Sequence, residues 1–343
     1  MSTGKEAKAA IKKAASWSTP AELASGDAIL FTTEKINRTR EHLPDDSAGQ
    51  AFHQDAERGA ITCGGDLSAY LRYQGLEVLL ALALGQAGVP AAAGGAYTHS
   101  LRLASGLGGV FGTLGIFKGF SVHEYPSVKV DGFSIGGEAG KPLTASFSLI
   151  CDDLNVNTVS GVNTTTVLAA IAAPAPGNRV LFRQGQFWIN DAAAGALGEA
   201  HAVHPNRFSL SCKRKLSRDY LAGGQDRIAE PAGAGFPELS LTLEFPTYTS
   251  DTFLNDLGAD TRKKMRIAFT GGPIESGHDH ALEILLPHLV ITNASAAVDK
   301  AGKIAHPITM ECLATSVERA GMEGLSAPLA LNLTNTRATD PLA

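Results

Sequence analysis

Short alternations of apolar and polar residues recur along the chain, and glycine or proline separates them. In the stretch DLSAYLRY, Leu67, Ala69, Leu71 and Tyr73 share one face and the intervening residues share the other. A period of two predicts a strand with one buried face. Similar alternations, such as RFSLSCKRKL and LTASFSLICD, predict a mainly β protein with short strands and many turns.

Helical patterns are few and short. GLEVLLALALG predicts a largely buried helix that ends at Gly85, and TYTSDTFLNDLG predicts a short helix capped by Thr249 or Ser250 and stopped at Gly258. The lysine-rich N-terminus predicts a polar arm with a brief helix over residues 5–15.

The phrase that begins at Asp66 returns as ELSLTLEF at Glu238. Two further echoes follow: KPLTASFSL with HPITMECLA, and the stretch around Pro126 with the stretch around Pro287. Echoes in the same order indicate a tandem duplication, although two unrelated β domains are the alternative because Leu-x-Leu is common in strands. The predicted organisation is an N-terminal arm (1–24), a first domain (25–175), a linker (176–204), a second domain (205–320) and a C-terminal extension (321–343).

Composition narrows the function. A chain of 343 residues exceeds one usual core, and a net charge of −5 disfavours a free nucleic-acid binder. Four widely spaced cysteines without a CxxC pair indicate buried free thiols. His278 and His280 lack a visible third ligand, and no phosphate loop or nucleophile elbow is present. The sequence therefore predicts no catalytic, cofactor or metal site, and no membrane span.

Two long polar segments stand at matching places before the paired phrases. The first is acidic and mixed, and the second begins with the basic run CKRKLSR, so contact between the loops of different copies is one interpretation and a plain solvated loop is the other.

Over roughly residues 15–320, the chain resembles phage tail tube proteins, the major tail proteins of long-tailed, non-contractile phages. The resemblance lies in the arm followed by ASWSTP, in GDLSAYLRYQGLEVLLALALG, and in the run from NRFSLSCKRKLSRDY through Glu230 and Pro231 to ELSLTLEF and LEILLPHLVIT.

The resemblance implies a β-sandwich or barrel of two antiparallel sheets with a flanking short helix, and the sequence echoes predict two such domains in tandem. It also implies rings that join sheet to sheet and stack into a tube. With two domains per chain, three chains would make a ring of pseudo-sixfold symmetry. The implied partners are other copies, tape-measure, terminator and tail-tip proteins, and double-stranded DNA that passes without specific binding.

The implied location is the virion tail, after assembly in the bacterial host cytoplasm. A head-tail connector, a tail-tip ring and a carbohydrate-binding β-sandwich are the alternatives, and the low aromatic content of 6% disfavours the last.

Two sets of residues are candidates for assembly. The candidate ring-stacking residues are Arg40, Glu41, Asp45, Asp46, Asp55, Glu57, Arg58, Arg214, Lys215, Arg218, Asp219, Asp226, Arg227 and Glu230. The candidate lumen-facing residues are Asp66, Ser68, Arg72, Glu238, Ser240 and Glu244.

Overall fold

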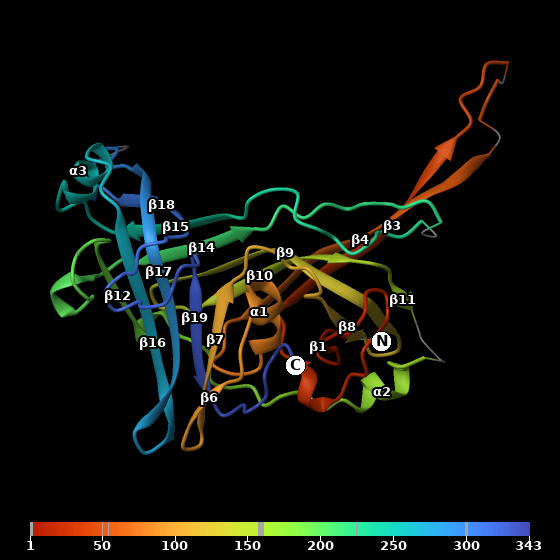
Figure 1. The fold of residues 1–343 in the computed structure, drawn as a ribbon. Coiled ribbons are helices and arrows are strands. Elements are labelled where there is room, and N and C mark those ends of the chain that lie inside the picture. Colours follow the sequence, from red (N-terminus) through yellow and green to blue (C-terminus); the bar gives the residue numbers. More distant parts are fainter. Residues whose placement is uncertain (1–2, 50, 54, 157–160, 224–225, 299–300) are drawn as a thin grey trace.

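The computed structural model describes residues 3–49, 51–53, 55–156, 161–223, 226–298 and 301–343 (Figure 1). Antiparallel strands dominate it and helices are few, which confirms the mainly β prediction.

The elements up to residue 170 are β1 (Lys8–Lys13), η1 (Ser25–Asp27), β2 (Ala28–Ile29), β3 (Thr33–Pro44), β4 (Ala56–Tyr70), α1 (Glu77–Leu84), β5 (Gly85–Gln86), β6 (Ala91–Ala93), β7 (Ala96–Leu103), β8 (Gly112–Phe117), β9 (Val122–Glu138), β10 (Thr144–Cys151), β11 (Asn155–Val156) and α2 (Thr165–Ala170). Those after it are η2 (Phe182–Gln184), β12 (Gly185–Asp191), η3 (Glu199–His201), β13 (Ala202–Val203), β14 (Arg207–Lys213), β15 (Glu238–Phe245), α3 (Thr252–Gly258), β16 (Lys263–Glu275), β17 (His278–Ala294), β18 (His306–Cys312) and β19 (Ala330–Asn335).

One run of pairings forms a continuous antiparallel layer in the order β3-β4-β10-β9-β14-β15-β18-β17, called here the long sheet. It divides into a first unit (β3, β4, β9, β10) and a second unit (β14, β15, β17, β18). In both units the first strand in chain order pairs with the second, the second with the fourth, and the fourth with the third. The two units meet where β9 pairs with β14.

The strands β9 and β17 each change partners along their length. The first part of β9 pairs with β8, which pairs with β1, and the first part of β17 pairs with β16, which pairs with β12. Their later parts belong to the long sheet. Each long strand thus carries the chain from an outer sheet into the long sheet, and a core fills the space between.

Helix α1 lies inside this core, because every residue from Glu77 to Leu84 is buried. It ends as predicted at Gly85, which has a left-handed conformation with φ of 83°. All four cysteines are buried free thiols, as the sequence indicates.

Several expectations are wrong. Residues 8–13 form strand β1 rather than a helix, because Ala9, Ala10 and Ile11 are buried beside β8. The first of the two long polar segments, residues 37–60, is mostly a hairpin of β3 and β4 rather than the expected loop. Helix α3 has Asp251 as its N-cap rather than Thr249 or Ser250.

The expected connecting and terminal segments also carry strands. Strand β12, in the predicted linker, pairs with β16 along its whole length and buries Phe187 and Trp188. Strand β19, in the predicted C-terminal extension, pairs with both β17 and β7. Both segments belong to the folded body.

The strand register keeps two of the three sequence echoes aligned. Ser68 lies opposite Ser146, and Ser240, which the first echo matches to Ser68, lies opposite Glu311, which the second echo matches to Ser146. The third echo is out of register. That echo matches Phe133 to Ala294. In the ladder, Phe133 lies opposite Phe147 and Leu289 lies opposite Cys312, the residue that the second echo matches to Phe147, so Leu289 is the residue that corresponds to Phe133.

Candidate assembly and lumen surfaces

A row of small hydroxyl side chains crosses the long sheet on its solvent-facing side. Opposite residues follow one another in the order Thr33, Ser68, Ser146, Ser134, Ser211, Ser240, Glu311 and Val290. Two hydroxyl pairs bond across strands: the Oγ atoms of Ser68 and Ser146 are 3.0 Å apart, and those of Ser211 and Ser240 are 2.9 Å apart. The other side of the same strands is the core, with Leu67, Phe147 and Leu239 buried.

Paired charges flank this hydroxyl row. Lys215 Nζ lies 2.5 Å from Glu238 Oε1, and Arg207 Nη1 lies 3.4 Å from Glu244 Oε1. The hydrogen bond from Lys215 holds the pKa of Glu238 below its usual value. The face therefore presents neutral hydroxyls between compensated charges, with no single sign of charge to attract a polyanion strongly.

The candidate lumen-facing residues divide accordingly. Asp66, Ser68, Glu238, Ser240 and Glu244 lie on strands of the long sheet, on the side that carries the hydroxyl row. Arg72 lies beyond the end of β4, where it donates to the Gly177 carbonyl, so it leaves the face. The sequence reasoning missed Ser134, Ser146 and Ser211, although the alternations GFSI, ASFSL and FSLSC carry the signal.

The second polar segment is described over residues 214–223 and 226–237, and we call these residues the docked loop. They lie against the part of the chain that precedes β12. Arg214 is 3% exposed and donates to the carbonyls of Ala83 and Leu84 at the end of α1 and to that of Ala104, which follows β7. Burial lowers the pKa of its guanidinium. A cation beside the exposed carbonyls of a helix C-terminus is stabilising, so Arg214 fixes the start of the loop to the core.

Further along, Glu230 meets a buried cation. Its Oε1 atom lies 2.6 Å from Lys129 Nζ, whose side chain is 1% exposed, and it also accepts from the Gly109 N–H at 2.7 Å. Lys129 also donates to the Pro231 carbonyl. Burial lowers the pKa of Lys129, and Glu230 opposes that shift.

The tip of the docked loop reaches the base of the β3–β4 hairpin. The Tyr220 hydroxyl donates to the Ile61 carbonyl, the Ile61 N–H donates to the Asp226 carbonyl, and Arg40 forms an ion pair of 3.1 Å with Asp226. Arg227 forms an ion pair of 2.7 Å with Asp153. Among the ring-stacking candidates, five are therefore engaged within their own chain: Arg40, Arg214, Asp226, Arg227 and Glu230.

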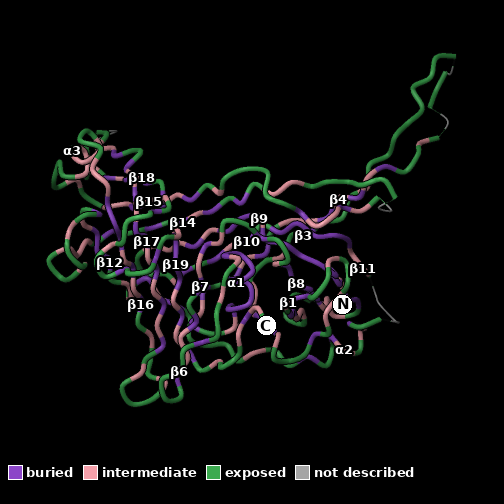
Figure 2. The backbone as a smooth tube through the Cα atoms, in the orientation of Figure 1, coloured by how far each residue is buried: buried purple, intermediate pink, exposed green. Residues whose placement is uncertain are grey.

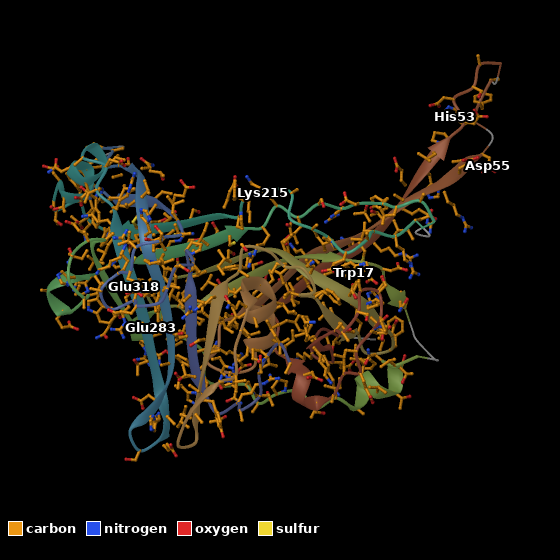
Figure 3. All side chains as sticks on the ribbon, in the orientation of Figure 1. Trp17, His53, Asp55, Lys215, Glu283 and Glu318 are labelled. Carbon is orange, nitrogen blue, oxygen red and sulfur yellow. The ribbon has the colours of Figure 1, made fainter. Side chains whose placement is uncertain are left out.

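Other candidates of the docked loop point to solvent. Lys215, Arg218 and Asp219 are exposed, as are Tyr220 and Leu221 on the same loop. Lys215 projects from the upper surface in Figure 3.

The outer part of the β3–β4 hairpin, residues 41–58, projects away from the body, and we call it the arm (Figure 2). All of its described residues are exposed except Ala56, which is half-buried. It carries the remaining ring-stacking candidates: Glu41, Asp45, Asp46, Asp55, Glu57 and Arg58. His53 and Asp55 are labelled on the outer part of the arm in Figure 3, and His53 pairs with Asp46 at 3.1 Å.

The long sheet ends in two edges. Among the described residues, β3 pairs only with β4, and residues 290–294 of β17 pair only with β18. A groove of about 370 Å³ runs beside residues 28–34, which lead into β3. Unpaired strand edges are sites where another strand can add.

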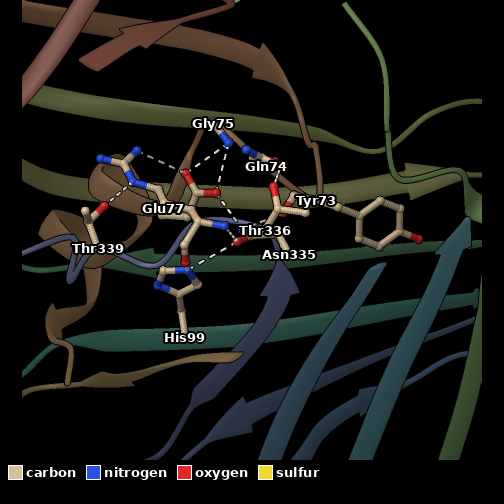
Figure 4. Close-up of polar contacts among 9 residues, drawn as sticks. Tyr73, Gln74, Gly75, Glu77, His99, Asn335, Thr336 and Thr339 are labelled. Atoms are coloured by element: carbon tan, nitrogen blue, oxygen red, sulfur yellow. Dashed lines mark hydrogen bonds and ion pairs between the residues drawn. The ribbon is translucent and has the colours of Figure 1, made fainter. Parts of the chain in front are cut away.

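A buried polar cluster joins β19 to α1 (Figure 4). The Glu77 carboxylate is fully buried, accepts from the Gly75 N–H and from Asn335 Nδ2 at 2.6 Å, and lies 3.6 Å from Arg337 Nη1. Asn335 Oδ1 lies 3.3 Å from His99 Nε2. Because the buried Glu77 carboxylate of α1 binds Asn335 and Arg337, this cluster fixes the C-terminal strand β19 to the core.

Within the described ranges, no group of three or more His, Cys, Asp or Glu residues is placed to hold a metal ion. No helix in the same part of the chain is both long and apolar enough to cross a membrane. His280 is buried, with its ring 6.0 Å from that of Tyr73 and its Nε2 3.2 Å from Asn178 Nδ2.

Comparison with known proteins identifies the class. Residues 4–312 match the family described as phage tail tube protein. A solved structure, "Cryo-EM structure of the anti-feeding prophage (AFP) baseplate, 6-fold symmetrised", is similar at 12% identity with a TM-score of 0.28, over 40% of this chain and 91% of that chain. No curated protein matches the sequence.

The match defines a structural protein of a phage tail. The chain belongs to the phage tail tube protein family, in agreement with the resemblance seen in its sequence.

Proposed function

We propose that this chain builds the tail tube from rings of three copies, which stack and conduct double-stranded DNA into the host. Each chain would supply two tube domains, the first and second units with their outer sheets, so that three chains give a ring of pseudo-sixfold symmetry. The observation that carries this proposal is the repeated strand order of the long sheet, with a complete unit-to-unit junction at its centre.

The central junction serves as a template for the junction between copies. In the hydroxyl row, Ser134 of β9 lies opposite Ser211 of β14. The residue in the place of Ser134 in the second unit is Val290, and the residue in the place of Ser211 in the first unit is Thr33. Repeating the junction puts Val290 of one copy opposite Thr33 of the next.

This closure also removes the two open edges. Strand addition would pair residues 290–294 of one copy with the segment around Thr33 of the next, beside the groove that residues 28–34 line. A closed barrel has no strand edges left for unspecific pairing. Closed rings that then stack head to tail give an open-ended tube.

The solvent-facing side of the long sheet suits the lumen. Hydroxyls between compensated charges offer passing phosphates no array of free cations, so few counterions would be released on contact. DNA would pass without specific binding. Within the virion tail, tape-measure, terminator and tail-tip proteins would be further partners, and assembly would take place in the bacterial host cytoplasm.

A cysteine pair tests the ring. In tubes of Thr33→Cys/Val290→Cys, oxidation is expected to give disulfide-linked dimers and trimers and nothing larger, because a three-membered ring closes. The four native thiols are buried and give a low background. Each single variant and the mismatched pair Thr33→Cys/Glu311→Cys are the controls.

A ladder that continues to six chains would show that a ring contains six copies. Intact tubes without any cross-link would show that the edges do not meet in this register. Electron microscopy of the same samples separates a tube from the single closed ring expected of a connector or tail-tip protein.

A further inference from the structure

We propose that the arm of one chain binds the docked loop of the adjacent chain in the same ring. This inference rests on the proposed function for the ring, and it assigns the arm a lateral partner rather than a seat on the next ring. Three observations carry it: an internal template, complementary surfaces, and the side of the sheet from which both segments leave.

The internal template is the contact between the docked loop and the first unit. The docked loop connects β14 to β15, and its tip reaches across to Ile61 and Arg40, at the base of the hairpin of the first unit. The arm connects β3 to β4, the corresponding strands. Within one chain, the docked loop of the second unit reaches the hairpin base of the first unit. If each first unit is placed in the same way beside the second unit of the adjacent chain, its arm reaches the base of that chain's docked loop.

The two surfaces are complementary in charge. The arm carries Glu41, Asp45, Asp46, Asp55 and Glu57 against a single arginine, Arg58. Two exposed basic residues at the base of the docked loop lie outside the Lys215–Glu238 pair, namely Lys213 and Arg218. Opposite charges on two different patches of one chain favour a contact between copies, in which each copy gives one patch and receives the other.

Both surfaces also expose apolar side chains. On the arm, Phe52 is 84% exposed and Leu43 is 47% exposed. On the docked loop, Leu221 is 65% exposed and Phe236 is 91% exposed. Large aromatic side chains in solvent commonly mark contact surfaces, and a two-stranded ribbon alone is only marginally stable in water. The arm therefore gains from a partner that covers it.

The direction of both segments makes the contact lateral. Since neighbouring strands alternate in direction and β3 and β14 are four places apart in the long sheet, they point the same way. The arm follows β3 and the docked loop follows β14, so both leave the sheet on the same side, as Figure 1 shows. In a ring of identically oriented chains they share one rim, where the arm of one chain meets the docked loop of its neighbour.

Photo-cross-linking from the arm tests this contact. Phe52 is replaced by the benzophenone amino acid p-benzoylphenylalanine, and assembled tubes are irradiated. We expect cross-linked peptides from residues 213–238 and a ladder of chains that ends at three. The same substitution at Phe120, which is 74% exposed in the turn between β8 and β9, is the matched control and should give no such peptides.

The charge contribution has its own test. The variant Lys213→Glu/Arg218→Glu should lower the Phe52 cross-link yield by about two- to fivefold, the range expected for exposed ion pairs. An unchanged yield in assembled tubes would contradict electrostatic docking.

A Phe52 ladder longer than three, in tubes whose Thr33–Val290 ladder stops at three, would show that the arm bridges rings. That result would overturn the lateral contact and leave the proposed function intact. Cross-links only outside residues 213–238 would also overturn it. Failure to form any tube, with no Thr33–Val290 cross-link, would instead count against the proposed function.

Discussion

The arm and the docked loop occupy matching places in the two units but have different environments. Each connects the first strand of a unit to the second. The docked loop buries Arg214 and places Glu230 beside Lys129, whereas the described residues 41–49, 51–53 and 55–58 of the arm lie almost entirely in solvent. The difference lies in the neighbouring structure. The docked loop packs against the first unit of its own chain, whereas the arm belongs to the hairpin that contains β3, the strand at the edge of the long sheet.

The connection between the first two strands of a unit can therefore pack within its own chain, as the docked loop does, or remain exposed for a contact between chains, as we propose for the arm. Arg214 and Glu230 are charged, as surface residues commonly are. In the folded chain, however, Arg214 donates to carbonyls of α1 and Glu230 accepts from the buried Lys129. On the arm, Asp46 pairs with an exposed histidine, His53, rather than with a buried cation. The adjacent copy in the proposed ring would supply what the first unit supplies to the docked loop.

The largest expected effect comes from removing each segment in turn. Replacing residues 216–235 by a short turn should destabilise the soluble subunit by about 3–5 kcal/mol or prevent its folding, because Lys129 loses its partner and buried surface is opened. Replacing residues 43–57 by Asn-Gly should cost less than about 1 kcal/mol, because His42 lies opposite Arg58 and a two-residue turn then joins them. Urea unfolding of the two variants measures both values, and equal losses would contradict the comparison.

A second prediction compares two arginines. Arg214→Ala should lower the free energy of unfolding by about 3 kcal/mol, because the carbonyls at the end of α1 lose their donors inside the core. Arg58→Ala, on the exposed arm, should change it by less than about 0.5 kcal/mol. Denaturant unfolding of the two single variants is the measurement. A loss below 1 kcal/mol for Arg214→Ala would show that the docked loop is held by other contacts.

Local sequence patterns were sufficient to predict the secondary structure of elements that have one buried face. The alternation in DLSAYLRY and ELSLTLEF predicts β4 and β15 because their apolar residues face the core, and Gly85 marks the end of α1 because glycine readily adopts the left-handed conformation. The matched serines of these phrases also occupy corresponding rungs of the ladder.

Elements without such a face were missed. Most of β3 and the outer part of β4 are exposed on both sides, so no alternation distinguishes the hairpin from a loop. Strand β1 has a lysine- and alanine-rich sequence that favours a helix, but pairing with β8 and burial of Ile11 override that preference. The roles of Arg214 and Glu230 depend on distant residues, which local sequence patterns do not show.

The smallest effect concerns the charge pair inside the docked loop. In Glu230→Gln the amide oxygen can still accept from Gly109, so the variant mainly removes the charge beside Lys129. We expect a loss of about 1–3 kcal/mol, lower than for a fully buried pair because the Glu230 side chain is 32% exposed. The matched double variant Lys129→Met/Glu230→Gln should recover at least half of it, since no buried charge is left unpaired.

The pH dependence gives an independent check of the same pair. Burial already lowers the pKa of Lys129 from its ordinary 10.5, and Glu230 opposes that shift. In Glu230→Gln the folded-state pKa should fall further, so the unfolded chain binds the proton more tightly and stability rises as pH approaches 10.5. Urea unfolding between pH 7 and 10 should therefore show the loss shrinking in Glu230→Gln, with no such trend in the double variant. A pH-independent loss would mean that hydrogen bonding, rather than the charge of Glu230, fixes the docked loop to the first unit.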